Sequence, residues 1–154
     1  MLQRLLGWTQ MSLSKTFLLG TFLVLSACGL AMSNEDRLDR AEEAMAAGDF
    51  RAAIIGSKDV LRDEPDNVRG RLVLARASVG VSDGASAEKE FRRAMELGTE
   101  FGEIAPQFAQ SLLLQGKFAQ IIDEVPLEYA ANDPDLHVLS RIHGVAHLGM
   151  GKAK

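Results

Sequence analysis

The stretch RAEEAMAAGDFRAA, residues 40–53, joins the end of one predicted helix to the start of another. Alanine, glutamate and arginine on both sides of the turn favour helix. Gly48 lies just past the first helix, where glycine accepts a left-handed backbone because it carries no Cβ. Phe50 follows the turn and is expected to fill the elbow behind it. The stretch therefore predicts two helices joined by a short turn.

The same pattern returns at intervals of 34 residues. Ala41, Ala75 and Ala109 follow this step, and each is expected where two helices cross so closely that only a small side chain fits. The turn returns at 82–84 and again at 116–118. A period of 34 is the spacing of tetratricopeptide (TPR) repeats. We therefore expect an all-α fold, a TPR-type solenoid of antiparallel helix pairs.

The expected helices follow from the spacing of these marks. Pro65 ends the second helix, and Asp66 or Asn67 can cap the third. Pro106 conflicts with a helix interior, so the fifth helix is expected to begin near Ala105 rather than earlier. The expected helices are 35–47, 50–63, 67–80, 84–97, 102–115, 117–125 and 134–149, and the expected units are 35–67, 68–101, 102–133 and a partial unit 134–154.

The seventh helix resembles the first helix of another unit. Asp133 would cap it and Pro134 would be its first residue, with His143-Gly144 at the crossing and Gly151-Lys152 at the turn. Repeat arrays need polar capping units because one unit cannot bury its apolar face alone. We interpret the chain as the N-terminal portion of a longer solenoid. The alternative is a complete protein whose last helix is the cap.

A different segment precedes the repeats. Arg4 and Lys15 are the only charged residues before Glu35, and the apolar run 17–25 follows them. This order of positive, apolar and small residues is typical of a signal peptide, expected at 1–27. An uncleaved membrane anchor is the alternative, although small and polar residues dilute the run.

The run Leu25-Ser26-Ala27-Cys28 resembles the lipobox of bacterial lipoproteins. The resemblance implies cleavage before Cys28, acylation of that cysteine by a lipid such as palmitate, and a tether over 28–34. Gly29 follows the cysteine, and it differs from the usual inner-membrane retention signal. We therefore expect the periplasmic face of the outer membrane. An ordinary cysteine near a secretory cleavage site is the other interpretation.

The composition narrows the class of function. Without the segment before Cys28, 15 Lys and Arg stand against 21 Asp and Glu, a net charge of −6. Nucleic-acid binding needs a basic face, so we expect no nucleic-acid partner.

Few residues are arranged for catalysis or metal binding. His143 and His147 share a helix face, but Gly144 stands where a His-Glu-x-x-His zinc motif needs glutamate. Glu88 and Glu90, with nearby basic residues, are expected on solvated helix faces as i,i+4 pairs rather than as acid/base pairs. We expect no catalytic residues, no metal and no cofactor, and an enzyme is the weakest hypothesis.

A binding groove is expected along the first helix of each unit. Arg69 and Arg76 form a basic pair suited to a carboxylate of a peptide or of a uronic sugar. The alternative for the leucines is that they pack between helices. The predicted groove residues are Leu38, Glu42, Met45, Arg69, Leu72, Arg76, Val79, Glu103, Gln110, Leu113 and Leu114.

Several stretches together resemble the TPR-repeat lipoproteins that accompany PEP-CTERM/exosortase systems in Gram-negative bacteria. They are the lipobox with Cys28, residues 40–53, DEPDN at 63–67, AEKEFRRAMELG at 87–98 and LLLQGKF at 112–118. The resemblance implies a scaffold without known catalysis that binds envelope proteins of exopolysaccharide production, export or protein sorting. A glycan-binding module that contacts polysaccharide directly, or a general envelope-assembly lipoprotein, are the alternatives.

Three residues depart from that pattern. Ser82 and Gly84 occupy the second turn, and Ser57 replaces a larger core residue. These departures concern local packing more than the fold.

Overall fold

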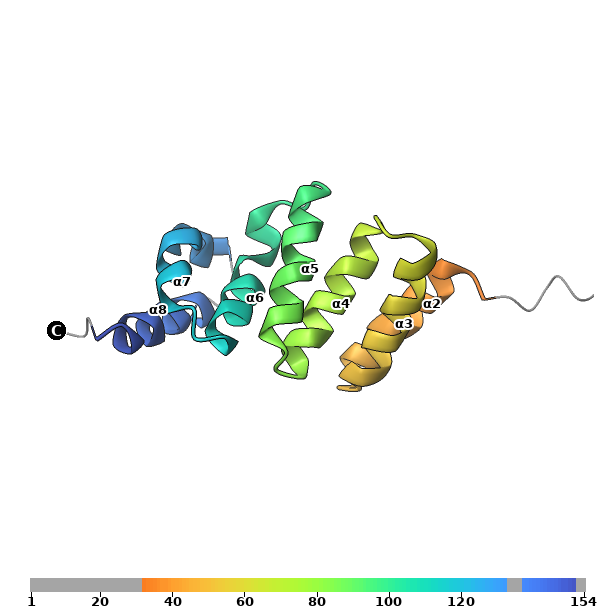
Figure 1. The fold of residues 1–154 in the computed structure, drawn as a ribbon, viewed down its shortest axis with the longest axis horizontal. Coiled ribbons are helices and arrows are strands. Elements are labelled where there is room, and N and C mark those ends of the chain that lie inside the picture. The colour runs from red at the N-terminus through yellow and green to blue at the C-terminus, as the bar shows by residue number, and fades with distance from the viewer. Residues whose placement is uncertain (1–31, 133–136, 152–154) are drawn as a thin grey trace, which may run out of the picture. The chain divides into compact units, whose positions relative to one another are not determined.

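The computed structural model describes residues 32–132 and 137–151, and these form helices and turns without a strand (Figure 1). Internal contacts divide the chain into Met1–Ser33 and Asn34–Lys154, and all the helices named here belong to the second unit. The predicted signal peptide, Cys28, Asp133 and Pro134 lie outside the described residues. The helices are α2 (Asn34–Ala46), α3 (Phe50–Asp63), α4 (Val68–Gly80), α5 (Gly84–Glu96), α6 (Phe101–Leu114), α7 (Phe118–Glu124), the 3-10 helix η2 (Leu127–Asn132) and α8 (Val138–Gly149).

The prediction of an all-α chain with adjacent helices packed in pairs is confirmed. Helix α2 packs on α3, α4 on α5 and α6 on α7. The bounds of these six helices differ by at most one residue at either end from the ranges predicted by the repeat spacing, whereas the start near Ala105 that Pro106 suggested for the fifth helix is four residues too late. Within the described residues, no helix is both long enough and apolar enough to cross a membrane.

The turns within the pairs use the predicted left-handed residues. Gly48 has φ 80° and Gly116 has φ 68°, whereas Ser82 adopts φ 61° at the equivalent place despite its Cβ. Asp49 and Asp83 then cap α3 and α5. The side chain of each aspartate accepts a hydrogen bond from the backbone N–H of the third residue of its helix, Ala52 or Ser86, at 3.0 Å. Local chemistry therefore fixes where each second helix begins.

Two phenylalanines pack on glycines of the next first helix. A Cβ on Gly80, at the end of α4, would lie 2.5 Å from ring carbons of Phe50. A Cβ on Gly149, at the end of α8, would lie 2.5 Å from the ring of Phe118. Phe50, the predicted elbow residue, and its counterpart Phe118 thus dock on the first helix of the following pair, where only glycine leaves room for the ring.

At the turn between α4 and α5 the positions of the large and the small residue are exchanged. Gly84 stands in place of phenylalanine, and a Cβ there would meet the carbonyl oxygen of Ser111 at 2.5 Å and the Cβ of Leu114 at 2.8 Å. The glycine lets the start of α5 approach the end of α6 directly. The unusual second turn is therefore a close contact and not a packing defect.

Small residues fill the crossings, as predicted. Ala41, Ala75 and Ala109 are buried, and a Cβ on Gly56 of α3 would lie 3.2 Å from the Cβ of Ala41. Ser57 is fully buried, and its hydroxyl donates to the carbonyl of Ala53 at 2.7 Å, so this departure from a larger core residue leaves no unpaired polar atom. One continuous core joins α4 to α8: Ala75, Ala87, Phe91, Ile104, Ala105, Phe108, Ala109, Leu112, Ile121, Val125, Leu139, Ile142 and Ala146.

The expectation for Pro106 is wrong. Helix α6 begins at Phe101, so Pro106 lies inside it and not in its first turn. A proline in a helix interior costs roughly 3 kcal/mol. Burial of the preceding turn offsets this cost, because Phe101 stacks edge-on against Phe108 at 5.8 Å and against Tyr129 at 5.0 Å, and Ile104 is fully buried.

The expected start of the last helix also needs correction. Helix α8 begins at Val138 rather than at 134, and the backbone of His137 occupies the cap position without a side-chain hydrogen bond. The ring of His143 is buried, and its Nε2 lies 2.7 Å from the carbonyl oxygen of Val125. This contact fixes α8 on the end of α7, so tertiary packing decides its position.

The docking of Phe50 on Gly80 predicts opposite effects for two similar substitutions. Gly80→Ala should lower the free energy of unfolding by about 1–3 kcal/mol, because the added methyl overlaps the ring. Gly144→Ala, where a Cβ meets nothing within 4 Å, should raise it by up to about 1 kcal/mol through helix propensity. Urea denaturation followed by circular dichroism measures both. Equal effects of the two variants would contradict this packing.

Candidate binding surface on the first helices

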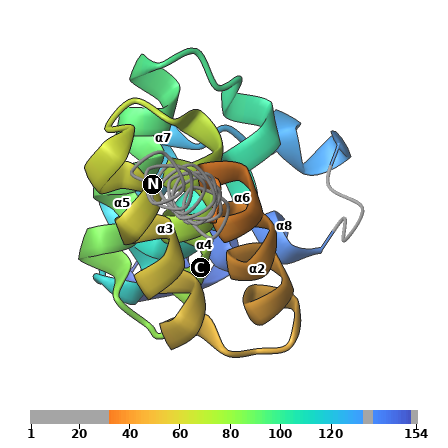
Figure 2. The ribbon, with the colours of Figure 1, turned by 90° about the vertical axis from the view of Figure 1, so that its right-hand side faces the viewer.

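The first helices of successive pairs lie side by side. Close Cα approaches join α2 to α4, α4 to α6 and α6 to α8. Within 34–124, no such approach joins α3 to α5 or α5 to α7. In Figure 2, α3, α5 and α7 lie toward the left and α2, α6 and α8 toward the right, with α4 between them. We call the surface of α2, α4, α6 and α8 the first-helix face.

Arg69 does not offer a free charge on this face. Its guanidinium contacts Glu35 at 2.6 Å, Asp39 at 2.6 Å and Glu42 at 2.7 Å. All three carboxylates belong to α2, so Arg69 ties α4 to the preceding pair. Its predicted role as a partner for a ligand's carboxylate is already filled from within the chain.

Arg76, the other member of the predicted basic pair, is different. It is half-buried on α4, and no hydrogen bond or ion pair of its guanidinium is found among the described residues. The pKa of Glu42 is lowered mainly by its hydrogen bond from Arg69, against the effect of burial, with a smaller contribution from the charge of Arg76. Arg76 therefore retains donors for a ligand.

The apolar candidates divide by depth. Leu38 is fully buried and belongs to the interior between α2 and α3 rather than to an accessible groove. Leu72, Val79 and Leu113 are half-buried and pack partly against the main core, which agrees with the alternative that the leucines pack between helices. Among the remaining candidates, Met45 is half-buried, and Glu103, Gln110 and Leu114 are exposed.

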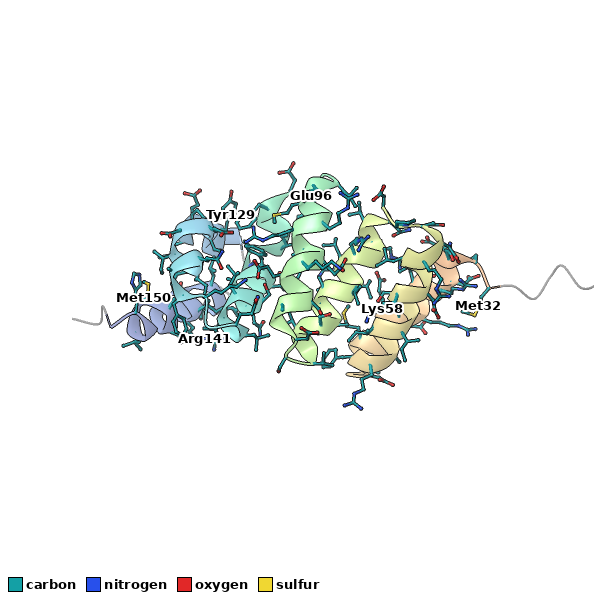
Figure 3. All side chains as sticks on the ribbon, in the orientation of Figure 1. Met32, Lys58, Glu96, Tyr129, Arg141 and Met150 are labelled. Atoms are coloured by element: carbon teal, nitrogen blue, oxygen red, sulfur yellow. The ribbon has the colours of Figure 1, made fainter. Side chains whose placement is uncertain are left out.

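A hollow of about 460 Å³ lies between α6 and α8 on this face. It falls within the size range of ligand pockets, roughly 300–1,000 Å³. Two predicted residues, Gln110 and Leu113, line it from α6. Figure 3 labels Arg141, which lines the hollow from α8. The other lining residues are Val138, Ile142 and Val145.

Sequence reasoning missed the contribution of α8. The repeat pattern predicts that the last helix is the first helix of a further unit, but the predicted groove includes no residue of that helix. The signal was present, because Val138, Arg141 and Val145 follow each other at helical spacing of three and four. Extending the repeat register by one unit would have found them.

The opposite side carries buried charges that were expected on a solvated face. Glu88 is 8 % exposed and Glu90 is 5 % exposed. Arg92 does pair with Glu88 at i,i+4, as predicted. However, Glu88 also accepts from Gln115 at 2.7 Å and from Lys117 at 2.6 Å, beyond the end of α6. The expectation of a solvated face is therefore wrong for these two glutamates.

The surroundings of Glu88 hold it charged. Burial would raise the pKa of its carboxyl, but hydrogen bonds from Lys117, Gln115 and Arg92 outweigh burial and lower it. Glu90 is paired with Arg71 of α4. The contact of Glu90 joins α4 to α5, and those of Glu88 join this pair to the turn between α6 and α7.

Arg92 also spans the gap between two second helices. Its guanidinium reaches Glu124 of α7 at 2.8 Å and lies 5.0 Å from the ring centre of Phe108. A further hollow of about 610 Å³ runs along α5 here, and paired charges line much of it. Its charged groups serve mainly to join the pairs, which makes it a weaker binding candidate than the first-helix face.

The histidines show no arrangement suited to a metal. His143 uses its Nε2 on the carbonyl of Val125, and His147 is exposed. Among the described residues, no three His, Cys, Asp or Glu side chains converge as metal ligands would.

Comparisons with protein-family models, with curated proteins and with solved structures gave no match.

The Glu88 cluster predicts a pH-dependent stability. The pKa of Glu88 in the folded protein lies below its unfolded value of about 4.3. Its contribution is therefore present above about pH 4.3 and is lost as the pH falls through the lowered pKa. Lys117→Met should lower the free energy of unfolding by about 1–2 kcal/mol at pH 7, because buried Glu88 loses a charged donor.

Urea denaturation at pH 7 and at pH 3 tests this expectation. The difference between Lys117→Met and the parent chain should shrink at pH 3, because this pH lies below the unfolded pKa of glutamate, about 4.3, and keeping Glu88 charged in the folded protein then requires release of a proton. Lys89→Met is the matched control, since Lys89 is 78 % exposed and its ion pair should contribute less than about 1 kcal/mol. A deficit of Lys117→Met that persists unchanged at low pH would contradict the role of Glu88.

Proposed function

We propose that this chain is a membrane-anchored TPR scaffold that binds other proteins of the bacterial envelope on its first-helix face. The main support is the side-by-side packing of α2, α4, α6 and α8, which builds one surface from successive 34-residue units. Repeat arrays use such surfaces to bind extended partners. Arg76 and Arg141 supply donors on it that no described carboxylate occupies.

The proposed anchor is the acylated Cys28 of a lipoprotein. Support comes from the sequence, where a positive segment and an apolar run precede Leu25-Ser26-Ala27-Cys28. Helix α2 begins at Asn34, six residues after the cysteine. At most about 3.5 Å per residue, such a tether reaches no more than about 21 Å. Partners of the first repeats would therefore be found near the membrane surface.

The proposed partners are proteins of exopolysaccharide production or export, or of PEP-CTERM protein sorting. The resemblance of residues 40–53, 63–67 and 87–98 to TPR lipoproteins of those systems is the support. The second candidate is direct binding of polysaccharide. A guanidinium such as that of Arg76 would suit a uronic acid, as it would a peptide carboxylate.

The lipid anchor is tested by replacing its cysteine. Cys28→Ala should abolish incorporation of radiolabelled palmitate and release the protein from sedimenting membranes, because one lost acylation site removes every lipid chain. Gly29→Ala is the matched control and should leave both properties unchanged. Membrane association without palmitate in Cys28→Ala would favour an uncleaved helix instead.

The binding face is tested by a pair of charge reversals. Arg76→Glu on α4 should abolish the co-purification of envelope proteins with the detergent-solubilised chain, because it places repulsion on the first-helix face. Arg51→Glu, at an exposed position of α3, should retain the co-purifying envelope proteins. Mass spectrometry of crosslinked eluates identifies the partners. Retention of polysaccharide without any protein would overturn the scaffold and favour the glycan-binding alternative.

A further inference from the structure

We propose that the hollow between α6 and α8 binds a partner segment that carries a leucine-sized side chain next to an aspartate or glutamate. This inference rests on the proposed function and names the chemistry that one part of the first-helix face recognises. Its walls, its polar groups and its continuation along the helices each contribute an argument.

The walls of the hollow select an apolar side chain. Leu113, Val138, Ile142 and Val145 surround it, and Val145 is 45 % exposed. A side chain of leucine size buries its surface there at roughly 25 cal/mol per Å². The volume of about 460 Å³ leaves room for the side chain and for the adjoining backbone.

The polar groups at the hollow select a carboxylate. Arg141 is exposed, and no hydrogen bond or ion pair of its guanidinium is found among residues 32–132 and 137–151. Gln110 is the other polar lining residue, and its amide can bond a peptide backbone. Among the described residues, no acidic side chain lines the hollow. In a domain of net negative charge, such a local positive group favours an acidic partner.

The surface beyond the hollow favours a segment longer than one residue. Along α8 the lining stripe continues to Leu148, which is 64 % exposed. A chain end alone would leave it uncovered. We therefore assign the hollow to an internal acidic–apolar segment of a protein partner.

Capped dipeptides provide the smallest probes of this chemistry. The full ¹⁵N-labelled chain in dodecylmaltoside micelles is titrated with acetyl-Leu-Glu-amide, and chemical shifts are followed by NMR. The amides of Leu113, Ile142 and Val145 should shift in a saturable manner. Acetyl-Leu-Gln-amide, which lacks the charge, and acetyl-Ala-Glu-amide, which lacks the isobutyl group, should each bind about three- to fivefold more weakly.

Arg141→Gln separates the charge from the fold. Because Arg141 is exposed, the variant should keep the parent's spectrum outside the hollow. It should weaken acetyl-Leu-Glu-amide about three- to fivefold and leave acetyl-Leu-Gln-amide unchanged. Arg51→Gln, a distant exposed arginine of α3, is the matched control and should leave both affinities unchanged.

Three outcomes would overturn the inference. They are equal binding of the charged and uncharged peptides, no effect of Arg141→Gln, or shifts confined to residues outside α6 and α8. Tighter binding of acetyl-leucine with a free carboxylate would assign the hollow to a C-terminus instead. If the peptides fail to bind but envelope proteins still co-purify in an Arg76-dependent manner, only this inference is overturned and the proposed scaffold stands. If no envelope protein co-purifies, the proposed function itself is wrong.

Discussion

The contact between each turn and the next first helix is the constraint on which the rest of this structure depends. Phe50 needs glycine at position 80, and Phe118 needs glycine at 149, because any Cβ there would overlap the ring. At the middle turn Gly84 faces Leu114, so the large and the small partner exchange places. A large group thus meets a small one at each junction. This complementarity brings the first helices into contact and so creates the surface on which the proposed function depends.

This packing also makes the first-helix face chemically different from the side formed by the second helices. On the first-helix side the backbones approach closely, whereas between α5 and α7 long charged side chains bridge the wider gap. Arg92 reaches Glu124, and Lys117 reaches Glu88. These cations are engaged in joining the pairs. What distinguishes the candidate binding face is therefore not the number of its arginines but that the guanidinium groups of Arg76 and Arg141 make no hydrogen bond or ion pair to a described carboxylate.

Local chemistry explains how much of the fold could be predicted from the sequence. Glycine past a helix end and aspartate before the next one act within a single turn, so six helices were placed to within one residue. Pro106 misled because its cost is local, while the burial of Phe101 and Ile104 that offsets it is tertiary. The start of α8 was missed for a similar reason, since the bond between His143 and Val125 joins residues 18 apart.

The candidate site was less predictable, because repeat register gives the face of a helix but not the depth or the partners of a side chain. Register placed Leu38 and Glu42 alike on α2, yet Leu38 is fully buried while Glu42 binds Arg69. The three acids around Arg69 lie at 35, 39 and 42, a spacing of four and three that the sequence does show. Predicting the contact of Arg69 with these three acids requires a comparison of charges between successive repeat units rather than within one unit.

Such a comparison also contrasts the first contact between first helices, α2 with α4, with the last, α6 with α8. The position occupied by Glu35 recurs 34 residues on as Arg69, and these opposite charges join α2 to α4. The next recurrence is Glu103, which is exposed while Arg69 is already saturated by α2. The recurrence after that is His137, which is exposed and lies just before α8, and the apolar Val138 next to it lines the hollow. Charged side chains thus join α2 to α4, whereas mostly apolar side chains line the hollow between α6 and α8. The result is an apolar hollow beside Arg141, whose guanidinium has no hydrogen-bond or ion-pair partner among residues 32–132 and 137–151.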